Sequence, residues 1–461
     1  MKPIHRFAAL LLALCLLCGC APQVGRETPV VSFYIYIPTT DDEVLEMIAA
    51  ELDRYVYETL GFHVQLHSPE DYHTAMSEAL RQGEPADVCM IHYNVASLAE
   101  EGLLRPLDAL LETEGHGIRE AIHPSYIEDA RIDGALYAFP TNRDRHTSYG
   151  FAYNRDIAEE YGLDLSGVTK LEDLTPVFAQ LNAVSDIYPT TTVFRTTRYQ
   201  VVDSLSDGCG VLMLEDAATV VNQYDTAAFT ELAEHLYQWN QAGYMLDYTL
   251  ENGDVAYYLG SGQVLGVLSE GHALHASQES KFSQGDIAYI PLTAAYYNSS
   301  NASRLGYAIP KTATHPHEAM ELLNLLYTDS YAANLLMYGV EGIHFVRSEE
   351  DPSVLTYPEN RSPEHYTGMN PWQYCNQYAA DRWDCYPADI WDKVEQANLS
   401  AIRSPAVGFV FDDTAVSRQL HDCSEVINEY LPLVKAGIVD PAQLLPQFRQ
   451  ALQEAGIDEV S

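Results

Sequence analysis

Residues 30–66 read VVSFYIYIPTTDDEVLEMIAAELDRYVYETLGFHVQL, and this stretch decides the fold. Apolar side chains alternate over residues 30–37, which predicts a buried first strand. Residues 38–41 end this strand and cap a helix that we predict from about residue 43 to residue 60, closed by Gly61. Residues 62–66 predict a second strand. A strand, a helix and a strand in this order are typical of a parallel α/β sheet.

The pattern continues on the C-terminal side of this unit. We predict strands at 87–91 and 287–291, a polar loop at 296–303, and helices at 72–82, 97–111, 156–161, 171–181, 227–241, 317–327, 415–431 and 444–455. A second α/β run begins near Tyr149, and residues 287–291 cross between the two runs. We therefore expect two α/β lobes joined by more than one crossing segment.

The composition excludes several classes of protein. A length of 461 residues predicts about three domains or two large ones, and 47% apolar residues exclude intrinsic disorder. The chain carries 25 Lys and Arg against 66 Asp and Glu, a net charge of −41, which excludes a nucleic-acid binder or a polybasic membrane binder. The 32 Tyr against 13 Phe indicate either a Tyr-rich core or a large wet groove lined with rings.

The first twenty residues predict the location of the protein. Lys2 and Arg6 precede an apolar run at 7–17 that is too short to span a membrane as a helix. The run leads to Cys20 and resembles the lipobox of bacterial lipoproteins. This resemblance implies cleavage before Cys20, diacylglycerol on its thiol and a further acyl chain, such as palmitate, on its amine. Residues 1–19 would then be the signal peptide and 20–29 a lipidated tether, with a mature charge of −43. The alternative is an ordinary signal peptide with a chance cysteine.

Five cysteines follow Cys20, an odd number, so at least one thiol is free or pairs outside the chain. Cys375 and Cys385 could form a disulfide, but their spacing does not decide this. The mature part has no C-x-x-C pair, so the cysteines indicate neither a disulfide scaffold nor a redox motif.

Cofactor, metal and catalytic motifs are weak. His272 and His275 lie three residues apart, and His315 and His317 flank a proline, but neither pair has a third ligand nearby in sequence. The glycines at 260–266 miss the dinucleotide-binding spacing by one residue. Ser269 misses the G-x-S-x-G spacing by one residue. We expect no cofactor and no metal.

Acidic pairs at 349–350 and 412–413 could act as glycosidase carboxylates. With 66 acidic residues in the chain, however, chance pairs are common. No catalytic constellation stands out, and we do not expect an enzyme.

Longer motifs carry a resemblance that covers nearly the whole mature chain. The motifs are AEEGLLRPLD at 99–108, DGALYAFP at 133–140, GFAYN at 150–154 and RLGYAIPK at 304–311. In this order they resemble family 1 extracellular solute-binding proteins, the receptors of ABC importers. GFVFD at 408–412, GIVDP at 437–441 and AGID at 455–458 resemble the lipoprotein subfamily that ends in a domain of unknown function and includes oligosaccharide-type receptors. Cys375 departs from the pattern, because relatives tend to carry glycine there.

The resemblance implies a two-lobed periplasmic-binding-protein-like α/β fold of type II, in which each lobe is a mixed sheet flanked by helices. The first lobe would comprise 30–140 and 291–328, and the second 141–290 and 329–461 with a helical C-terminal region. The hinge would cross near 139–141, 287–292 and 327–330. Such lobes close on a ligand like a hinged trap.

Sugar recognition needs rings for the apolar C–H faces and planar polar groups for paired hydroxyls. Loops after strands and residues beside the hinge supply such side chains. The expected ligand-binding residues are Tyr36, Thr39, Thr40, Asp41, Asn94, Asn142, Arg143, Tyr149, Glu270, Trp372 and Phe411. Tyr36 and Phe411 could equally pack in the core instead of contacting the ligand. Arg143 could equally form an ion pair within the protein.

The resemblance therefore predicts a monomeric receptor, lipid-anchored through Cys20 on the extracellular face of the bacterial cell membrane. It would deliver a carbohydrate, an oligosaccharide, to an ABC permease. The same fold also hosts receptors for peptides and other polar solutes, so this alternative stays open. A cell-surface glycoside hydrolase using an acidic pair is the alternative from another class.

Overall fold

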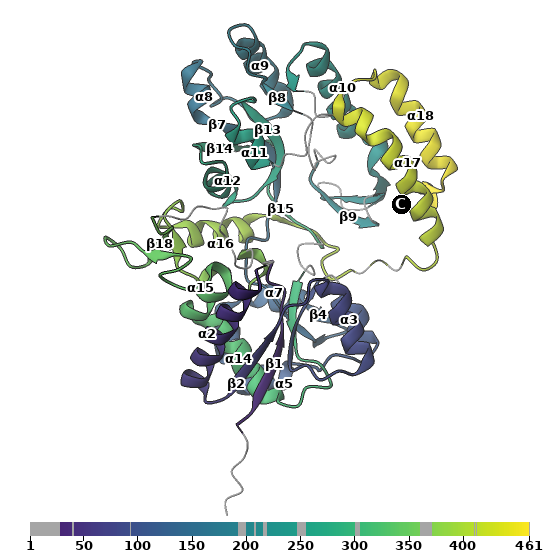
Figure 1. Cartoon of the computed structure of the whole chain (residues 1–461). Helices are drawn as coiled ribbons and strands as arrows, with labels where there is room; N and C mark the ends of the chain where they lie inside the picture. The colour runs from purple at the N-terminus through teal and green to yellow at the C-terminus, as the bar shows by residue number, and fades with distance from the viewer. Residues whose placement is uncertain are drawn as a thin grey trace, which may run out of the picture.

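The computed structural model describes residues 28–38, 41–92, 94–191, 200–206, 209–214, 219–246, 255–299, 305–359, 371–409, 411 and 413–460. Figure 1 shows two lobes, one above the other, with several segments of the chain between them. The N-terminal elements form the lower lobe, and the C-terminal helices lie on the upper one. Among the described residues we find no helix with the length and apolarity that a membrane span requires.

The first lobe is built on a five-stranded mixed sheet. Its strands, in spatial order, are β2 (His63–His67), β1 (Val30–Tyr34), β3 (Val88–His92), β16 (Leu305–Ala308) and β6 (Ala138–Pro140). β1 is parallel to both neighbours, whereas β16 is antiparallel to β3 and β6. The chain therefore leaves this lobe after β6 and returns to it with β16.

The helices of this lobe follow the predicted pattern. They include α2 (Asp42–Leu60), α3 (Tyr72–Gln82), α14 (Pro316–Thr328) and α15 (Ser330–Tyr338). Asp41 accepts hydrogen bonds from the backbone N–H groups at the start of α2, and Gly61 ends the helix at a φ of 83°. Ile48, Leu52 and Val56 are buried at helical spacing. The predicted spans of α2 and α3 are confirmed.

The predicted helix over 97–111 is wrong. Two short helices replace it, α4 (Val95–Glu100) and α5 (Asp108–Thr113). Gly102 adopts a φ of 72° between them, and Pro106 cannot continue a helix. The chain then forms α6 (His116–Ala121), α7 (Pro124–Asp129), β4 (Arg131–Ile132) and β5 (Ala135–Leu136).

The second lobe has β7 (Ser148–Asn154) at the centre of its sheet, antiparallel to β13 (Gly266–Gly271) and β14 (Ile287–Pro291). β8 (Thr190–Thr191) and β12 (Met245–Leu246) form a separate two-stranded parallel sheet, and an isolated parallel bridge between Tyr188 and Val264 connects the segments that precede β8 and β13. Its other elements are α8 (Arg155–Glu160), η1 (Leu171–Asp173), α9 (Leu174–Asn182), η3 (Gln223–Asp225), α10 (Ala227–Gln241), α11 (Val255–Gly260) and α12 (His275–Ser283). β9 (Val202–Ser206), β10 (Gly210–Met213) and β11 (Val220–Asn222) form a separate antiparallel sheet.

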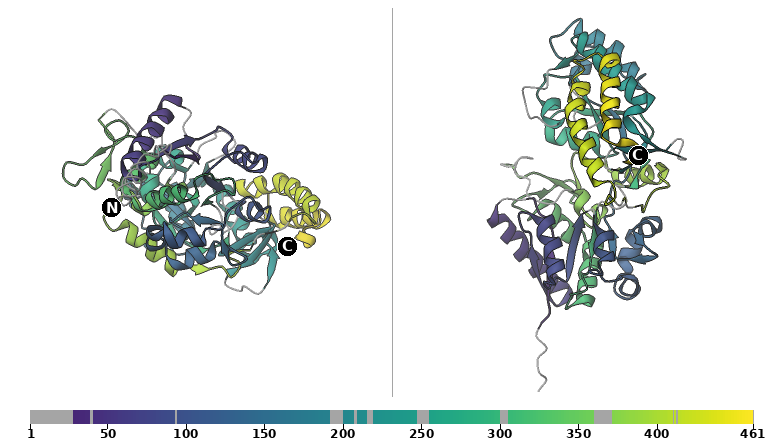
Figure 2. Two further views of the ribbon diagram at one scale, coloured as in Figure 1. Left: turned by 90° about the horizontal axis from the view of Figure 1, so that it is seen from below. Right: turned by 90° about the vertical axis from the view of Figure 1, so that its right-hand side faces the viewer.

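The C-terminal helices belong to the second lobe. They are α17 (Ser417–Ala436), α18 (Pro441–Glu454) and α19 (Ile457–Val460). Leu444, Phe448 and Ile457 share a buried cluster with Tyr224 and Phe229 of this lobe. Figure 2 shows α17 and α18 in yellow along the side of the upper lobe. The two predicted C-terminal helices are confirmed, although α17 extends further than predicted.

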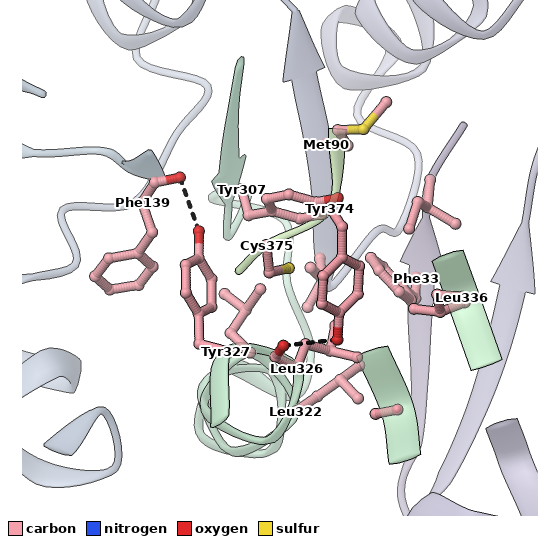
Figure 3. Packing of buried hydrophobic residues seen from close by; sticks show 14 of the residues in the cluster. Phe33, Met90, Phe139, Tyr307, Leu322, Leu326, Tyr327, Leu336, Tyr374 and Cys375 are labelled. Atoms are coloured by element: carbon pink, nitrogen blue, oxygen red, sulfur yellow. Dashed lines mark hydrogen bonds between the residues drawn. The ribbon is translucent and has the colours of Figure 1, made fainter. Parts of the chain in front are cut away.

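A long segment after α14 packs with the first lobe. It contains α15, β17 (Val346–Arg347), β18 (Val354–Thr356), η6 (Pro371–Gln373), η7 (Gln377–Ala379), β19 (Arg382–Trp383) and α16 (Ile390–Ser400). In Figure 3, Tyr374 and Cys375 lie beside Phe33 and Tyr307 of the first-lobe sheet. The Tyr374 hydroxyl donates to the carbonyl oxygen of Leu326 at 2.6 Å. The expected lobe boundary at 328/329 does not coincide with this packing.

The predicted polar loop at 296–303 is also wrong in its described part. Tyr296 and Tyr297 are buried and form β15, which pairs in parallel with β20 (Ile402–Arg403). This pairing ties the chain that leaves β14 to the chain that leaves α16. β15 and β20 lie between the lobes in Figure 1. Tyr296 and Tyr297 are therefore part of the junction between the two lobes.

Candidate functional site

Four side-chain rings contact one another in succession at the carboxyl edge of the first-lobe sheet. Tyr36 follows β1, His92 ends β3, His73 lies in the first turn of α3 and Trp372 lies in η6. Neighbouring ring centroids are 6.0 Å apart for Tyr36 and His73, 4.7 Å for His73 and His92, and 6.1 Å for His92 and Trp372. We call these four side chains the ring row. The carboxyl ends of parallel strands are where ligands bind in α/β sheets.

The ring row is accessible to a ligand. His73 is exposed, and Tyr36, His92 and Trp372 are half-buried. His73 and His92 stack face to face, with ring planes at 23°, and Tyr36 and Trp372 flank them with planes tilted by 36°. Sequence reasoning predicted Tyr36 and Trp372, and the structure brings them into one group. It missed the two histidines between them, although His92 directly follows a predicted strand.

A carboxylate–imidazole contact lies where the chain enters the second lobe. The Asp144 carboxylate lies 3.0 Å from Nδ1 of His272, which follows β13. Burial would raise the pKa of Asp144, but His272, Arg143 and His146 outweigh it and hold this pKa well below its usual range. Asp144 is therefore charged at neutral pH. It fixes the turn after β13 against the segment that crosses from the first lobe.

Glu270 is oriented by a tyrosine on the neighbouring strand. Tyr149 in β7 lies directly opposite Glu270 in β13, and its hydroxyl donates to Glu270 Oε1 at 2.9 Å. Glu270 is exposed, whereas the exposed fraction of Tyr149 is only 2%. Tyr149 is thus buried, and its hydroxyl contacts the exposed Glu270. The pair offers an oriented carboxylate at the end of the second-lobe sheet.

Asn142 and Arg143 lie inside the junction between the lobes. The Asn142 side chain donates to the carbonyl oxygen of Ala121 at 2.9 Å and to Oδ1 of Asn376 at 3.1 Å. Arg143 Nη1 donates to the carbonyl oxygen of Asp144 at 2.7 Å. Both residues are buried. These contacts position the crossing segment.

The other predicted site residues are dispersed. Asp41 caps α2 and is exposed, and Asn94 Nδ2 donates to Ser77 Oγ at 3.2 Å. Phe411 is half-buried in the segment that leads to α17. Thr39, Thr40 and Cys20 lie outside the described residues.

One arrangement resembles a catalytic triad but is poorly suited to catalysis. Ser269 Oγ lies 3.1 Å from Nε2 of His275, whose Nδ1 lies 3.8 Å from Glu279. That second distance is beyond a hydrogen bond. Burial and the neighbouring His272 lower the pKa of His275 to about 3, which makes it a weak general base. Ser269 and His275 are themselves buried.

One group of side chains has the composition of a metal site. The ligand atoms of Glu172, Glu231 and His235 lie within 4.8 Å of one another. Lys170 forms an ion pair with Glu172 there, so a cation already neutralises this carboxylate. The two histidine pairs considered from the sequence are not part of this group.

Two mixed α/β lobes joined by several crossing segments define a two-lobed binding protein of type II. Comparison with known proteins gives the same class. Residues 39–333 match the family described as bacterial extracellular solute-binding protein, and residues 405–461 match a domain of unknown function, DUF3502. The first match covers more than half of the chain, so this protein belongs to the bacterial extracellular solute-binding protein family. The resemblance inferred from the motifs is confirmed.

Individual proteins match over most of their length. A carbohydrate ABC transporter substrate-binding protein of Streptococcus pneumoniae serotype 4 is 26% identical, over 94% of this chain and 89% of that protein. The structure of the N-glycan transport solute-binding protein NgtS of S. pneumoniae superposes with a TM-score of 0.82 at 24% identity, covering 94% of this chain and 96% of that one. The sugar-binding protein MalE of Xanthomonas citri gives 0.55 at 15% identity, over 94% and 98%. The predicted fold class is confirmed.

Proposed function

We propose that this protein is the receptor of an ABC importer, and that it captures an oligosaccharide between its lobes and delivers it to the permease. The ring row is the observation that carries the proposal. Tyr36 and Trp372, the two half-buried rings at its ends, can pack against the C–H faces of sugar rings, while His73 and His92 stack on each other between them. The similarity to a carbohydrate ABC transporter protein and to NgtS supports the same ligand class.

Capture works by hinge closure. A ligand that contacts both lobes only in the closed form stabilises that form. The structure superposes better on NgtS alone, with a TM-score of 0.82, than on NgtS with Man1GlcNAc (0.72) or Man5GlcNAc (0.67). This difference supports an open arrangement of the lobes here. In such a receptor no bond of the ligand is made or broken.

The second lobe would supply the polar contacts. The exposed Glu270 carboxylate, oriented by Tyr149, can accept hydrogen bonds from paired hydroxyl groups. With a net charge of −41, the protein favours a neutral sugar over a strongly anionic one. We assign ligand contact to Tyr36, Trp372 and Glu270, and the positioning of the junction to Asn142 and Arg143. Asp41, Asn94 and Phe411 remain proposed contacts at the edge of the site.

The location follows from the same proposal. The family is extracellular, and an acylated Cys20 would hold the receptor on the outer face of the cell membrane. The tether of residues 20–29 would connect this anchor to β1. Mass spectrometry of the N-terminal peptide, from protein isolated from the bacterium that produces it, tests whether Cys20 is acylated. An unmodified Cys20 would contradict the anchor without affecting ligand binding.

Titration calorimetry on the purified protein tests the ligand. Neutral oligosaccharides of the Man-GlcNAc type should bind and be recovered intact. Trp372→Ala should weaken binding at least about tenfold, while Trp372→Phe, which keeps a ring, should weaken it less. Tyr57→Ala is the matched control, because Tyr57 is an exposed ring on α2 outside the ring row.

Other outcomes decide between the alternatives. Release of new reducing ends would identify a glycoside hydrolase. Binding of peptides but no sugar would identify a receptor for another solute. Unchanged sugar affinity in a folded Trp372→Ala variant would remove Trp372 from the site and overturn the role of the ring row.

A further inference from the structure

Strand β15 places one side chain in each lobe. Tyr296 is buried in a second-lobe cluster, where its ring centroid lies 6.1 Å from that of Tyr149 in β7. The hydroxyl of Tyr297 donates instead to Oδ2 of Asp129, the last residue of α7 in the first lobe, at 3.4 Å. Successive side chains of a strand point to opposite faces. The chain therefore passes from the second lobe to the first between Tyr296 and Tyr297.

Backbone hydrogen bonds tie two other crossing segments to β15. Thr147, which directly precedes β7, exchanges N–H···O hydrogen bonds of 2.8 and 2.9 Å with Tyr296. In the segment that leads from α16 to α17, the N–H of Ser404 donates to the carbonyl oxygen of Tyr297 at 2.8 Å. These three segments meet at one place, so a change in the angle between the lobes acts on all of them here.

Asp129 holds this meeting point on the first lobe. Only 5% of its side chain is exposed, and its Oδ1 forms an ion pair with Arg403, the residue of β20 that pairs with Tyr297. Arg145, on the segment that enters the second lobe, donates from Nη1 to the Tyr297 hydroxyl at 3.3 Å and lies 4.4 Å from the ring centroid of Tyr126 in α7. In Figure 1, α7 lies in the lower lobe below β15. One carboxylate is thus linked, directly or through Tyr297, to all three segments.

We propose that Asp129 is a positioning residue for ligand capture, and that with Arg145, Tyr297 and Arg403 it fixes the axis about which the lobes close. We call these four side chains the hinge network. The inference rests on the proposed capture of an oligosaccharide between the lobes, and it assigns these residues a role through the junction instead of through ligand contact. Hinges are a few residues at the ends of elements that absorb the change in backbone angle.

The network should increase affinity for the ligand. Closure on a ligand removes the freedom that the junction retains in the ligand-free protein, and this loss of entropy opposes binding. A junction that is already held in place has less freedom to lose. Hydrogen bonds to an ionised carboxylate are stronger than those between neutral groups, so the ion pair between Asp129 and Arg403 is the link to break first.

Arg403→Met tests the proposal, because 53% of the Arg403 side chain is exposed and its replacement leaves the core intact. In the ligand-free protein, hydrogen exchange followed by mass spectrometry should be faster in the peptides that contain residues 295–297 and 402–404. Calorimetric titration with neutral oligosaccharides of the Man-GlcNAc type should show an affinity lowered at least about threefold. Arg403→Lys, which keeps the charge, should restore most of that affinity.

Two further variants complete the experiment. Tyr297→Phe, which removes only the hydroxyl between Arg145 and Asp129, should also lower the affinity. Arg155→Met is the matched control, because Arg155 is an exposed arginine whose ion pair with Asp286, at 2.9 Å, lies within the second lobe. It should leave both the affinity and the exchange at residues 295–297 unchanged.

The outcomes separate this inference from the proposed function. Faster exchange in Arg403→Met with unchanged affinity would show that the hinge network only braces the fold, and would overturn the inference alone. Unchanged exchange, or an equal loss of affinity in Arg155→Met, would also overturn it. A parent protein that binds no oligosaccharide would overturn the proposed function, and this inference with it.

Discussion

The carboxylate of Asp144 lies 3.0 Å from Nδ1 of His272, and this pair belongs to a polar network at the junction of the lobes. Next to it, His146 Nδ1 lies 2.9 Å from Oδ1 of Asn398 on α16, and His146 Nε2 accepts the N–H of Ala273 at 3.1 Å. The network joins the segment that enters the second lobe to the turn after β13 and to α16.

Replacing Asp144 with Asn should destabilise the protein in a pH-dependent way. The folded-state pKa of Asp144 lies below its usual range, so its contribution is present above about pH 4 and is lost as the pH falls further. Loss of one partner of a buried pair costs on the order of 3 kcal/mol. Urea unfolding of both proteins from about pH 7 to about pH 3 should show a difference that shrinks in acid.

Asp133→Asn is the control for that measurement. Asp133 lies on an exposed turn with a φ of 50°, a conformation that Asn tolerates well. The free energy of unfolding of the Asp133→Asn variant should stay close to that of the parent protein. A constant difference between Asp144→Asn and the parent at all pH values would show that the charge of Asp144 is not what stabilises the junction.

Asn398 is the second residue on which the junction depends. Its Oδ1 accepts the backbone N–H groups of Arg145 and His146 at 2.8 and 3.1 Å, and its Nδ2 donates to the carbonyl oxygen of Arg143 at 2.9 Å. Asn398→Ala would leave buried donors without partners, so the free energy of unfolding should fall by about 2–4 kcal/mol. Gln396→Ala, on the exposed face of the same helix, should change it little. Equal effects of the two substitutions in urea unfolding would contradict this role.

Tyr149→Phe separates orientation of Glu270 from packing. The variant keeps the buried ring but loses the hydroxyl that donates to Glu270 Oε1. We expect oligosaccharide affinity to fall about three- to tenfold, with little change in melting temperature. Glu270→Gln should reduce affinity further, and Tyr57→Phe should leave it unchanged. Calorimetric titration measures all three, and wild-type affinity in Tyr149→Phe would mean that Glu270 needs no orienting partner.

Much of the fold could be predicted because apolar residues recur at helical spacing along its helices. α3 and α10 begin and end at the predicted residues. The prediction of a loop at Tyr296 was wrong, because two tyrosines followed by Asn and Ser are as compatible with a strand as with a turn. The return of Tyr374 to the first-lobe core could not be predicted, since long-range packing of a segment without period leaves no local signal.

The candidate site shows the same limit. Tyr36 and Trp372 could be predicted, because a ring after a strand or in a Pro- and Asn-rich loop fits sugar binding. His73 and His92 were missed, because a single histidine has no pattern around it. Tyr149 and Asn142 were predicted to contact the ligand, and both are buried. The sequence indicates that a tyrosine tolerates partial exposure to solvent, but it does not show which part of the side chain is exposed.

Lys281 should make the stability of the protein rise with pH. Its Nζ lies 3.6 Å from the ring centroid of Trp383 and 5.1 Å from that of Tyr357, so α12 of the second lobe contacts the first-lobe segment here. Burial lowers the pKa of Lys281 to about 8, although Cys385 and Asp384 act in the opposite direction. Between about pH 8 and the usual pKa of 10.5, the unfolded chain therefore binds more protons than the folded one.

The free energy of unfolding should consequently increase over this window, by at most about 3 kcal/mol from Lys281. Lys281→Met removes that contribution, so its stability should rise less steeply with pH than that of the parent. Urea unfolding at about pH 8 and about pH 10 measures the two slopes. Lys393→Met, which removes an exposed lysine on α16, should keep the parental slope. If Lys281→Met kept it too, the ammonium group would be as well solvated in the folded protein as in the unfolded chain, and the contact with Trp383 would not desolvate it.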